Sequence, residues 1–153
     1  VISDELIDKM KNASKFNQGF ANTEYLAATY LDMDWHSLVS TDIQDTNDFE
    51  RKSLEKIGLI DEIVSRYRTT YFQHIFTSSY SAGYYSYKWA EVLAADAFSR
   101  FEEGGVFNAE IGLSFRTEIL EQGGARDVMA MFVAFRGRKP SIDALLAQAG
   151  MKS

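Results

Sequence analysis

The residues best suited to chemistry lie between Phe72 and Trp89, in a segment dense in tyrosine. Four of the chain's eight tyrosines lie between positions 80 and 87 of this segment. If a helix begins near position 80, Tyr80, Tyr84 and Tyr87 occupy positions i, i+4 and i+7 and line one face. A row of neutral phenols could stabilise an oxyanion, bind peptide carbonyls or stack on an apolar ligand. The same spacing is typical of half-buried tyrosines that only pack, and periodicity alone favours packing.

The chain has two histidines, and neither is assigned chemistry by its neighbours alone. His74 lies in the aromatic segment, where a lone histidine is more often a hydrogen-bonded structural residue than an acid, base or ligand. His36 follows Asp32 and Asp34, but residues two apart on a helix point to different sides. Zinc requires three or four ligands that converge. A solvated helix face is therefore the expectation for this second group.

Several motifs of hydrolases and nucleotide-binding proteins are missing from the sequence. It contains no His-Glu-x-x-His, no Gly-x-Ser-x-Gly and no glycine-rich phosphate loop. We therefore expect neither a complete hydrolytic site nor a metal ligand within this chain.

The composition is that of a soluble globular protein and argues against two classes of partner. With 153 residues, 46% of them hydrophobic, the chain is long enough for one compact domain. A net charge of −6 argues against a nucleic-acid partner, because phosphate binding depends on excess Lys and Arg. No apolar run approaches the ~20 residues that span a membrane. There is no cysteine, so no disulfide is expected, and the compartment, cytoplasmic or periplasmic, stays open.

The pattern of caps and apolar spacing predicts an all-α fold, a single multi-helix unit over residues 1–153. Proline occurs once, and strand-like alternation is scarce. Ser3 and Asp45 are expected to cap helices, and Gly104 and Gly105 to end one. The expected helices cover approximately 3–13, 19–38, 45–59, 61–67, 82–103, 108–122, 126–135 and 141–149. An irregular loop with some extended structure is expected around 71–81. Because the chain begins at Val1 without methionine, we expect it to be cut from something longer.

Nearly the whole chain resembles one family, the zinc peptidases that include thimet oligopeptidase, oligopeptidase A and bacterial peptidyl-dipeptidase. The peptidyl-dipeptidase branch is the most similar. The stretches that carry the resemblance are Phe16–Phe20, Thr23–Ala27, Asp32–His36, His74–Trp89, Lys88–Leu93, Ala95–Phe98, Phe101–Gly105 and Phe135–Pro140. The resemblance implies that the chain is the C-terminal part of a larger metallopeptidase catalytic domain.

The resemblance also implies roles for four residues. In the family, two histidines of His-Glu-x-x-His and a glutamate on the next helix hold zinc, and the motif's own glutamate activates water. All of these would lie upstream of this chain. By match to the family pattern, Tyr80 and Tyr87 are the catalytic tyrosines near the scissile carbonyl, and His74 binds substrate. Tyr84 is a weaker candidate for lining the cleft.

One departure from the family concerns the loop before the first of these tyrosines. Where relatives commonly have glycines, this chain has Thr77, Ser78 and Ser79, and it keeps only Gly83 afterwards. Glycine permits positive φ at little steric cost, so the serines are expected to stiffen or redirect the loop.

Two functions remain open. In the first, the full-length parent hydrolyses short peptides with zinc, and this chain is inactive alone because it supplies only substrate-binding and oxyanion-stabilising residues. In the second, the chain is a non-enzymatic helical domain that binds a peptide or a protein. The expected partners are short peptides and the remainder of the parent domain, and an isolated chain with uncovered surface is expected to self-associate.

Overall fold

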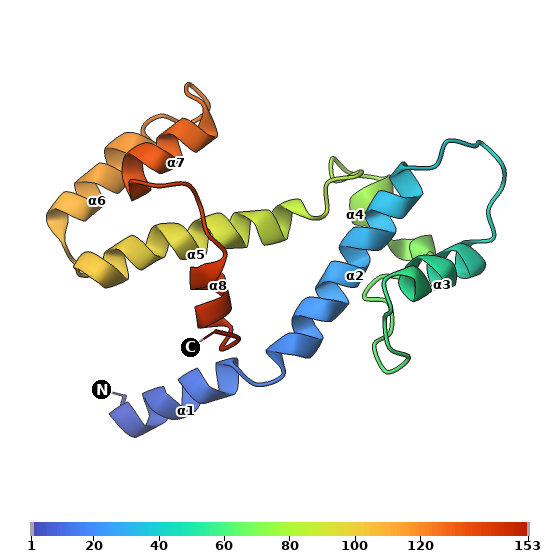
Figure 1. The fold of residues 1–153 in the computed structure, drawn as a ribbon, viewed down its shortest axis with the longest axis horizontal. Helices are drawn as coiled ribbons and strands as arrows, with labels where there is room; N and C mark the ends of the chain where they lie inside the picture. The colour runs from blue at the N-terminus through green and yellow to red at the C-terminus, as the bar shows by residue number, and fades with distance from the viewer. Residues whose placement is uncertain (1, 153) are drawn as a thin grey trace. The chain divides into compact units, whose positions relative to one another are not determined.

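The computed structural model describes residues 2–152, and within that range it is helical without a strand, which confirms the predicted all-α class (Figure 1). The α-helices are α1 (Asp4–Ser14), α2 (Gln18–His36), α3 (Thr46–Lys56), α4 (Gln73–Phe76), α5 (Ser86–Gly104), α6 (Ala109–Phe115), α7 (Val128–Arg136) and α8 (Asp143–Gln148). A 3-10 turn covers Thr69–Tyr71, and a π-helical segment, Arg116–Leu120, continues α6. None of the helices in the described range is long and apolar enough to cross a membrane.

The chain divides into two compact units, Val1–Tyr87 and Lys88–Ser153. All four predicted site residues belong to the first unit. That residues 1–153 form one helical unit within a larger catalytic domain stays a prediction.

Side-chain caps lie at the starts of α1, α3, α6 and α7. The Ser3 hydroxyl accepts a hydrogen bond from the Leu6 amide at 3.3 Å, and Asp45 accepts one from the Asp48 amide at 2.8 Å. The predicted caps at Ser3 and Asp45 are therefore confirmed. A residue with positive φ, Gly105 at 103°, follows the end of α5, which is the glycine function expected there.

One predicted helix is absent and the predicted start of another is wrong, and both differences lie in the first unit. Residues 61–67 form turns and bends, where Arg66 forms an ion pair with Glu24 at 3.1 Å. Helix α5 begins at Ser86 rather than near position 80 or 82. Ala82 has a φ of +52°, which is incompatible with a right-handed helix. The expected extended structure around 71–81 is likewise absent, because α4 and turns occupy it.

The core of the first unit lies where the segment 69–84 packs on α2. Its buried residues are Ala28, Phe72, Ile75 and Tyr84, with Tyr25, Trp35 and Tyr67 packed against them. Helix α3 joins through a stack of Phe49 on Trp35, with ring centroids 3.8 Å apart. The buried Glu50 carboxylate of α3 accepts the Thr69 amide at 2.9 Å and forms an ion pair with Arg68 at 2.6 Å. Helices α2 and α3 thus hold both ends of the segment that carries the site.

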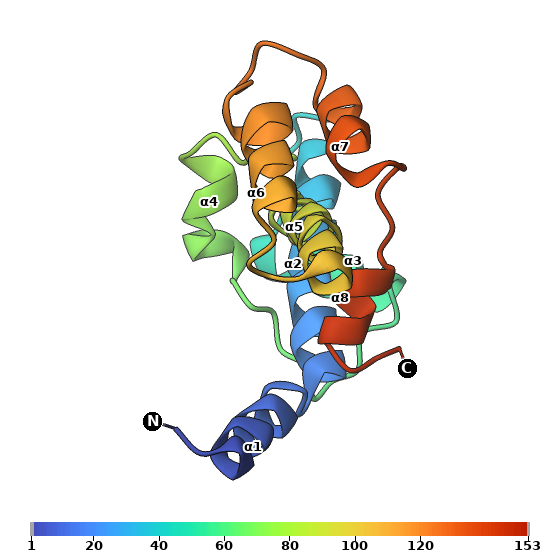
Figure 2. The ribbon, with the colours of Figure 1, turned by 90° about the vertical axis from the view of Figure 1, so that its left-hand side faces the viewer.

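The second unit is organised around one buried carboxylate on α5. Asp96 has no exposed surface, and Arg138 binds it with two hydrogen bonds of 2.5 and 2.7 Å. Arg136 at the end of α7 also contacts it, at 3.2 Å, as does the Ser141 amide, at 2.7 Å. In Figures 1 and 2, α6 and α7 lie next to each other, and their Phe115 and Phe135 rings meet edge to face at 5.2 Å.

Because Asp96 is a buried, paired carboxylate, we expect the free energy of unfolding of the second unit to fall in acid. Burial alone raises the pKa of Asp96, but hydrogen bonds from Arg138, the Ser141 amide and Arg136 outweigh burial and hold the pKa below its ordinary value. Its stabilising effect is therefore complete above the unfolded pKa of about 3.9 and is lost as pH falls through the lowered folded value. Urea unfolding of the chain from pH 6 to pH 2 should show this loss in residues 88–153. Asp96→Asn should be less stable at pH 6 and should have a flatter pH profile; an unchanged profile would contradict the assignment.

Candidate functional site

Four side chains from the sequence prediction meet in one group, which we call the aromatic cluster: His74, Tyr80, Tyr84 and Tyr87. The Tyr80 and Tyr87 rings are stacked, with centroids 4.9 Å apart and planes 18° apart. The His74 ring has its centroid 6.3 Å from that of Tyr80, 5.7 Å from Tyr84 and 6.5 Å from Tyr87, in each case edge to face. The structure thus brings together every residue that the resemblance singles out.

A turn brings the tyrosines together, in place of the helical spacing that the sequence suggests. The Gly83 amide donates to the Tyr80 carbonyl at 2.8 Å, and the Ser86 amide donates to Gly83 at 3.0 Å. These residues form consecutive turns before α5 starts. Tyr80 lies at the beginning of the turns and Tyr87 lies in the first turn of α5, and their rings stack.

The four side chains differ in how much solvent they reach. Tyr84 is buried, with 3% of its surface exposed, and its ring packs against Tyr25 and Phe72. Tyr87 is 38% exposed, and His74 and Tyr80 are partly exposed. Tyr84 therefore forms the floor of the cluster, while the other three side chains are open to a ligand.

Hydroxyl groups on both sides of Tyr80 donate hydrogen bonds to carbonyls of α4. Thr77 Oγ1 donates to the Gln73 carbonyl at 3.0 Å, Ser78 Oγ donates to the His74 carbonyl, and Ser81 Oγ donates to the Ile75 carbonyl at 2.7 Å. Glycine at the first two positions could not form these bonds. They are consistent with the predicted stiffening of the loop, whose motion stays a prediction.

Two phenols of the cluster, those of Tyr84 and Tyr87, have raised pKa values. The hydrogen bond with Tyr80, together with partial burial, raises the pKa of Tyr87 to about 12. Burial raises the pKa of Tyr84, although a hydrogen bond with Arg66 acts in the opposite direction. A phenol that keeps its proton at neutral pH can donate a hydrogen bond to a developing negative charge.

This arrangement predicts that Tyr87 depends on Tyr80 for its raised pKa. Tyr80→Phe removes the hydrogen-bond partner, so the pKa of Tyr87 should fall from about 12 toward its ordinary value near 10. A 13C NMR titration with label on the tyrosine ring carbon that bears oxygen measures it, with Tyr87→Phe identifying the signal. Tyr85→Phe, an exposed neighbour outside the cluster, is the control and should leave the titration unchanged. A pKa that stays at 12 in Tyr80→Phe would contradict the paired phenols.

Sequence reasoning missed the residues of α2 that hold the cluster. The solvated helix face expected for Asp32 is wrong, because this residue is fully buried and its carboxylate accepts the amides of Ala82 at 3.0 Å and Tyr84 at 2.9 Å. The Tyr25 hydroxyl donates to the Tyr84 carbonyl at 2.8 Å. The sequence does contain a signal, because Tyr25, Ala28 and Asp32 share one face of α2 with buried apolar residues, and an acidic residue there needs a partner.

Among the residues that the structure describes, the side chains that could hold a metal do not converge. Within residues 2–152, no group of three or more His, Cys, Asp or Glu side chains is placed to bind a metal ion. His36 instead has its Nδ1 atom 2.8 Å from the Asp32 carboxylate. The described residues therefore do not fit a zinc site.

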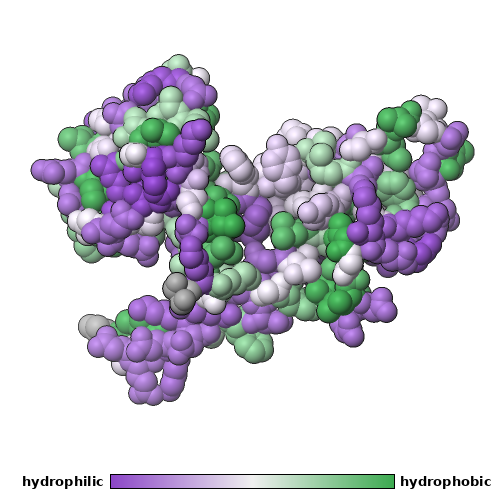
Figure 3. Space-filling view, viewed as in Figure 1, coloured by the Kyte–Doolittle hydropathy of each residue, from purple (hydrophilic) through white to green (hydrophobic). Residues whose placement is uncertain are grey.

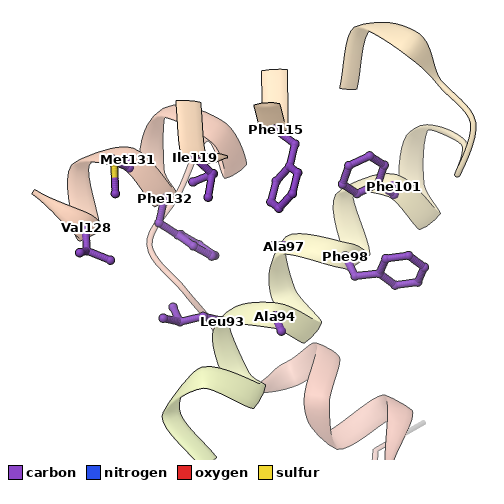
Figure 4. Close-up of a pocket in the computed structure, with 10 residues that line it drawn as sticks. All are labelled: Leu93, Ala94, Ala97, Phe98, Phe101, Phe115, Ile119, Val128, Met131 and Phe132. Carbon is purple, nitrogen blue, oxygen red and sulfur yellow. The ribbon is translucent and has the colours of Figure 1, made fainter. Parts of the chain in front are cut away.

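A pocket lies in the unit Lys88–Ser153, and its lining is almost entirely apolar. It has a volume of about 410 Å³ and is lined by Leu93, Ala94, Ala97, Phe98, Phe101, Phe115, Ile119, Val128, Met131 and Phe132 (Figure 4). Hydrophobic residues also reach the surface in both units, as the space-filling view shows (Figure 3). With no polar side chain in its lining, this pocket has no group that could take part in acid, base or nucleophilic chemistry.

Comparison with known proteins shows the family of the chain. The model of Peptidase family M3 matches residues 1–151. The chain belongs to this peptidase family. It is 42% identical to dipeptidyl carboxypeptidase of Escherichia coli over 150 residues, 97% of the chain and 22% of that protein. It is 41% identical to oligopeptidase A of Escherichia coli, with 97% and 22% covered, and 32% identical to saccharolysin of Saccharomyces cerevisiae, with 99% and 22% covered. This member of family M3 thus spans about a fifth of the length of these relatives.

Proposed function

We propose that this chain is the C-terminal part of a zinc-dependent peptidase that hydrolyses short peptides, as an oligopeptidase or a peptidyl-dipeptidase. The observation that carries the proposal is the aromatic cluster, in which two stacked phenols and a histidine lie together at a partly open surface. Family membership supports it, because the relatives that cover the whole chain have peptidase names.

In this proposal the chain acts on the charge that develops during hydrolysis. Attack of water on a peptide carbonyl places negative charge on its oxygen, and hydrogen-bond donors already in position stabilise that charge more than the neutral carbonyl. Tyr80 and Tyr87 donate these bonds. Their hydroxyls lie on stacked rings and form a hydrogen bond with each other, and each hydroxyl can rotate its hydrogen toward a substrate oxygen that both can reach. The raised pKa of Tyr87 keeps its proton in place throughout the neutral range.

The other two residues of the cluster position the substrate and the phenols. The His74 ring lies edge to face with the rings of Tyr80 and Tyr87, and one of its ring N–H groups can donate a hydrogen bond to a peptide carbonyl. Tyr84 supports the three from below, because its buried ring touches His74 and Tyr87. Its proposed part in substrate binding is therefore to shape the floor of the cleft.

Zinc belongs to the proposal through the family, and its ligands would come from parts of the parent outside this chain. Bound zinc would supply Lewis-acid activation of water and carbonyl. The chain alone is consequently expected to be inactive. The remaining partners, which are the rest of the parent domain and a second copy of the isolated chain, are proposed from the exposed apolar side chains of both units.

The test uses the full-length parent and this chain side by side with short unblocked peptides. The proposal predicts cleavage by the parent, loss of cleavage after chelation, return with zinc, and no cleavage by the chain. A parent that binds peptides without cleaving them would favour the second function, a non-enzymatic helical binding domain. The side chains of the cluster that reach solvent could bind a peptide in an enzyme or in a binding domain. Turnover is therefore the measurement that distinguishes the two functions.

A further inference from the structure

The turn that carries Tyr80 and Tyr84 contains a strained residue. Ala82 has a φ of +52°, and a left-handed conformation costs a residue with a Cβ on the order of 1–2 kcal/mol. Glycine takes this conformation without that cost, yet the glycine of this turn, Gly83, is the following residue. A strained residue persists only where surrounding contacts determine it. Something outside the turn must therefore hold Ala82.

The contact that does so comes from Asp32, far earlier in the chain on α2. One carboxylate oxygen accepts the Ala82 amide at 3.0 Å and the other accepts the Tyr84 amide at 2.9 Å. The carboxylate thus accepts hydrogen bonds from the residues on both sides of Gly83. Hydrogen bonds from amides to a charged acceptor are about twice as strong as those to a neutral one.

The surroundings of Asp32 fix its own position. Its side chain has no exposed surface, and His36, one turn later on α2, places Nδ1 2.8 Å from the carboxylate. From the same helix, the Tyr25 hydroxyl donates to the Tyr84 carbonyl at 2.8 Å, and the Tyr25 ring stacks on that of Tyr84. Helix α2 therefore binds both the amide and the carbonyl of Tyr84.

We propose that Asp32 is a positioning residue of the aromatic cluster: its buried carboxylate holds the strained turn at Ala82 so that the phenols of Tyr80 and Tyr87 stack. It touches no substrate in this account. The consequence for turnover rests on the proposed function, whereas the consequence for the turn does not. Misplacing a reacting group by about 1 Å can reduce turnover by the order of 100-fold.

The experiment compares Asp32→Asn with Asp34→Asn in the full-length parent. The first substitution leaves one acceptor oxygen in place of two and turns an amide group toward the other backbone N–H. Asp34 is the matched control, because it lies on the same helix but binds Ser53 at 2.7 Å and Lys56 at 3.0 Å on α3 rather than the turn. Both residue-resolved hydrogen exchange at Ala82 and Tyr84 and the separate values of kcat and KM are measured.

The proposal predicts that Asp32→Asn speeds exchange at both amides at least tenfold and lowers kcat at least tenfold, with KM changed less than threefold. Asp34→Asn should leave exchange at these amides and kcat within twofold. Unchanged exchange in Asp32→Asn would overturn the proposal, and so would an equal loss in Asp34→Asn, which indicates general destabilisation.

Two further readouts keep the test decisive. In the unsubstituted parent, the Ala82 and Tyr84 amides should exchange at least tenfold more slowly than an unstructured chain; exchange at the unstructured rate overturns the proposal even if Asp32→Asn fails to fold. If Asp32→Asn frees the turn while Tyr80→Phe and Tyr87→Phe leave kcat unchanged, the positioning of the turn stands and the proposed function of the phenols fails.

Discussion

Replacing Tyr87 by phenylalanine in the full-length parent should lower kcat by the order of a hundred- to a thousand-fold, the cost of losing one oxyanion donor. KM should change less than threefold, because a hydrogen bond made mainly in the transition state contributes little to ground-state binding. Tyr80→Phe should have a similar effect. The rings stay in place in both variants, since phenylalanine retains the stack of 4.9 Å. Steady-state kinetics on one short peptide measures the effect.

The control for these substitutions is Tyr85→Phe. Tyr85 lies in the same turn with 53% of its surface exposed, and it is not part of the cluster. Its kcat should stay within twofold of the unsubstituted parent. A loss shared by all three variants would indicate disruption of the turn, and no loss in Tyr80→Phe and Tyr87→Phe would remove both from catalysis.

The largest expected effect on stability comes from Asp96→Ala in the second unit. The substitution leaves the guanidinium groups of Arg136 and Arg138 without the carboxylate that both bind, and the Arg136 side chain is only 10% exposed. Removing one partner of a buried ion pair costs about 3–5 kcal/mol. Arg136 keeps its ion pair with Glu103 and Arg138 is 44% exposed, so we expect a loss of about 3 kcal/mol, the lower end of that range. Urea unfolding, read by hydrogen exchange in residues 88–153, measures the change.

Asp143→Ala is the matched control for this prediction. Asp143 also binds Ser141 and forms an ion pair with Lys152, but its side chain is 61% exposed. Exposed pairs contribute little to stability, so no measurable change is expected. Equal effects of the two substitutions would contradict the central place of Asp96.

Local signals in the sequence account for most helices. The caps at Ser3 and Asp45 act within one helical turn, and Gly105 ends α5 through its own φ. Such short-range chemistry is visible in a sequence. The family resemblance, rather than periodicity, singles out His74, Tyr80 and Tyr87, since periodicity favours packing for the tyrosines.

What the sequence does not predict depends on contacts between distant residues. The expected start of α5 is wrong because Asp32 binds the amides of Ala82 and Tyr84, and no local preference of an alanine indicates a positive φ. The helix expected over 61–67 is also wrong: these residues form turns and bends, and the Arg66 side chain pairs with the distant Glu24 on α2. The stacking of Tyr80 on Tyr87 follows from the turn and not from helical spacing.

The binding of a tetrahedral analogue of the transition state to Tyr87→Phe tests the central claim most directly. A phosphinic peptide carries charged oxygens where the oxyanion develops, whereas a slowly cleaved peptide of the same sequence carries a neutral carbonyl. If Tyr80 and Tyr87 stabilise the oxyanion, Tyr87→Phe should raise the dissociation constant of the phosphinic peptide by the order of 100-fold. It should change the dissociation constant of the slowly cleaved peptide less than threefold. Equal weakening of the two ligands, or no weakening of either, would contradict it.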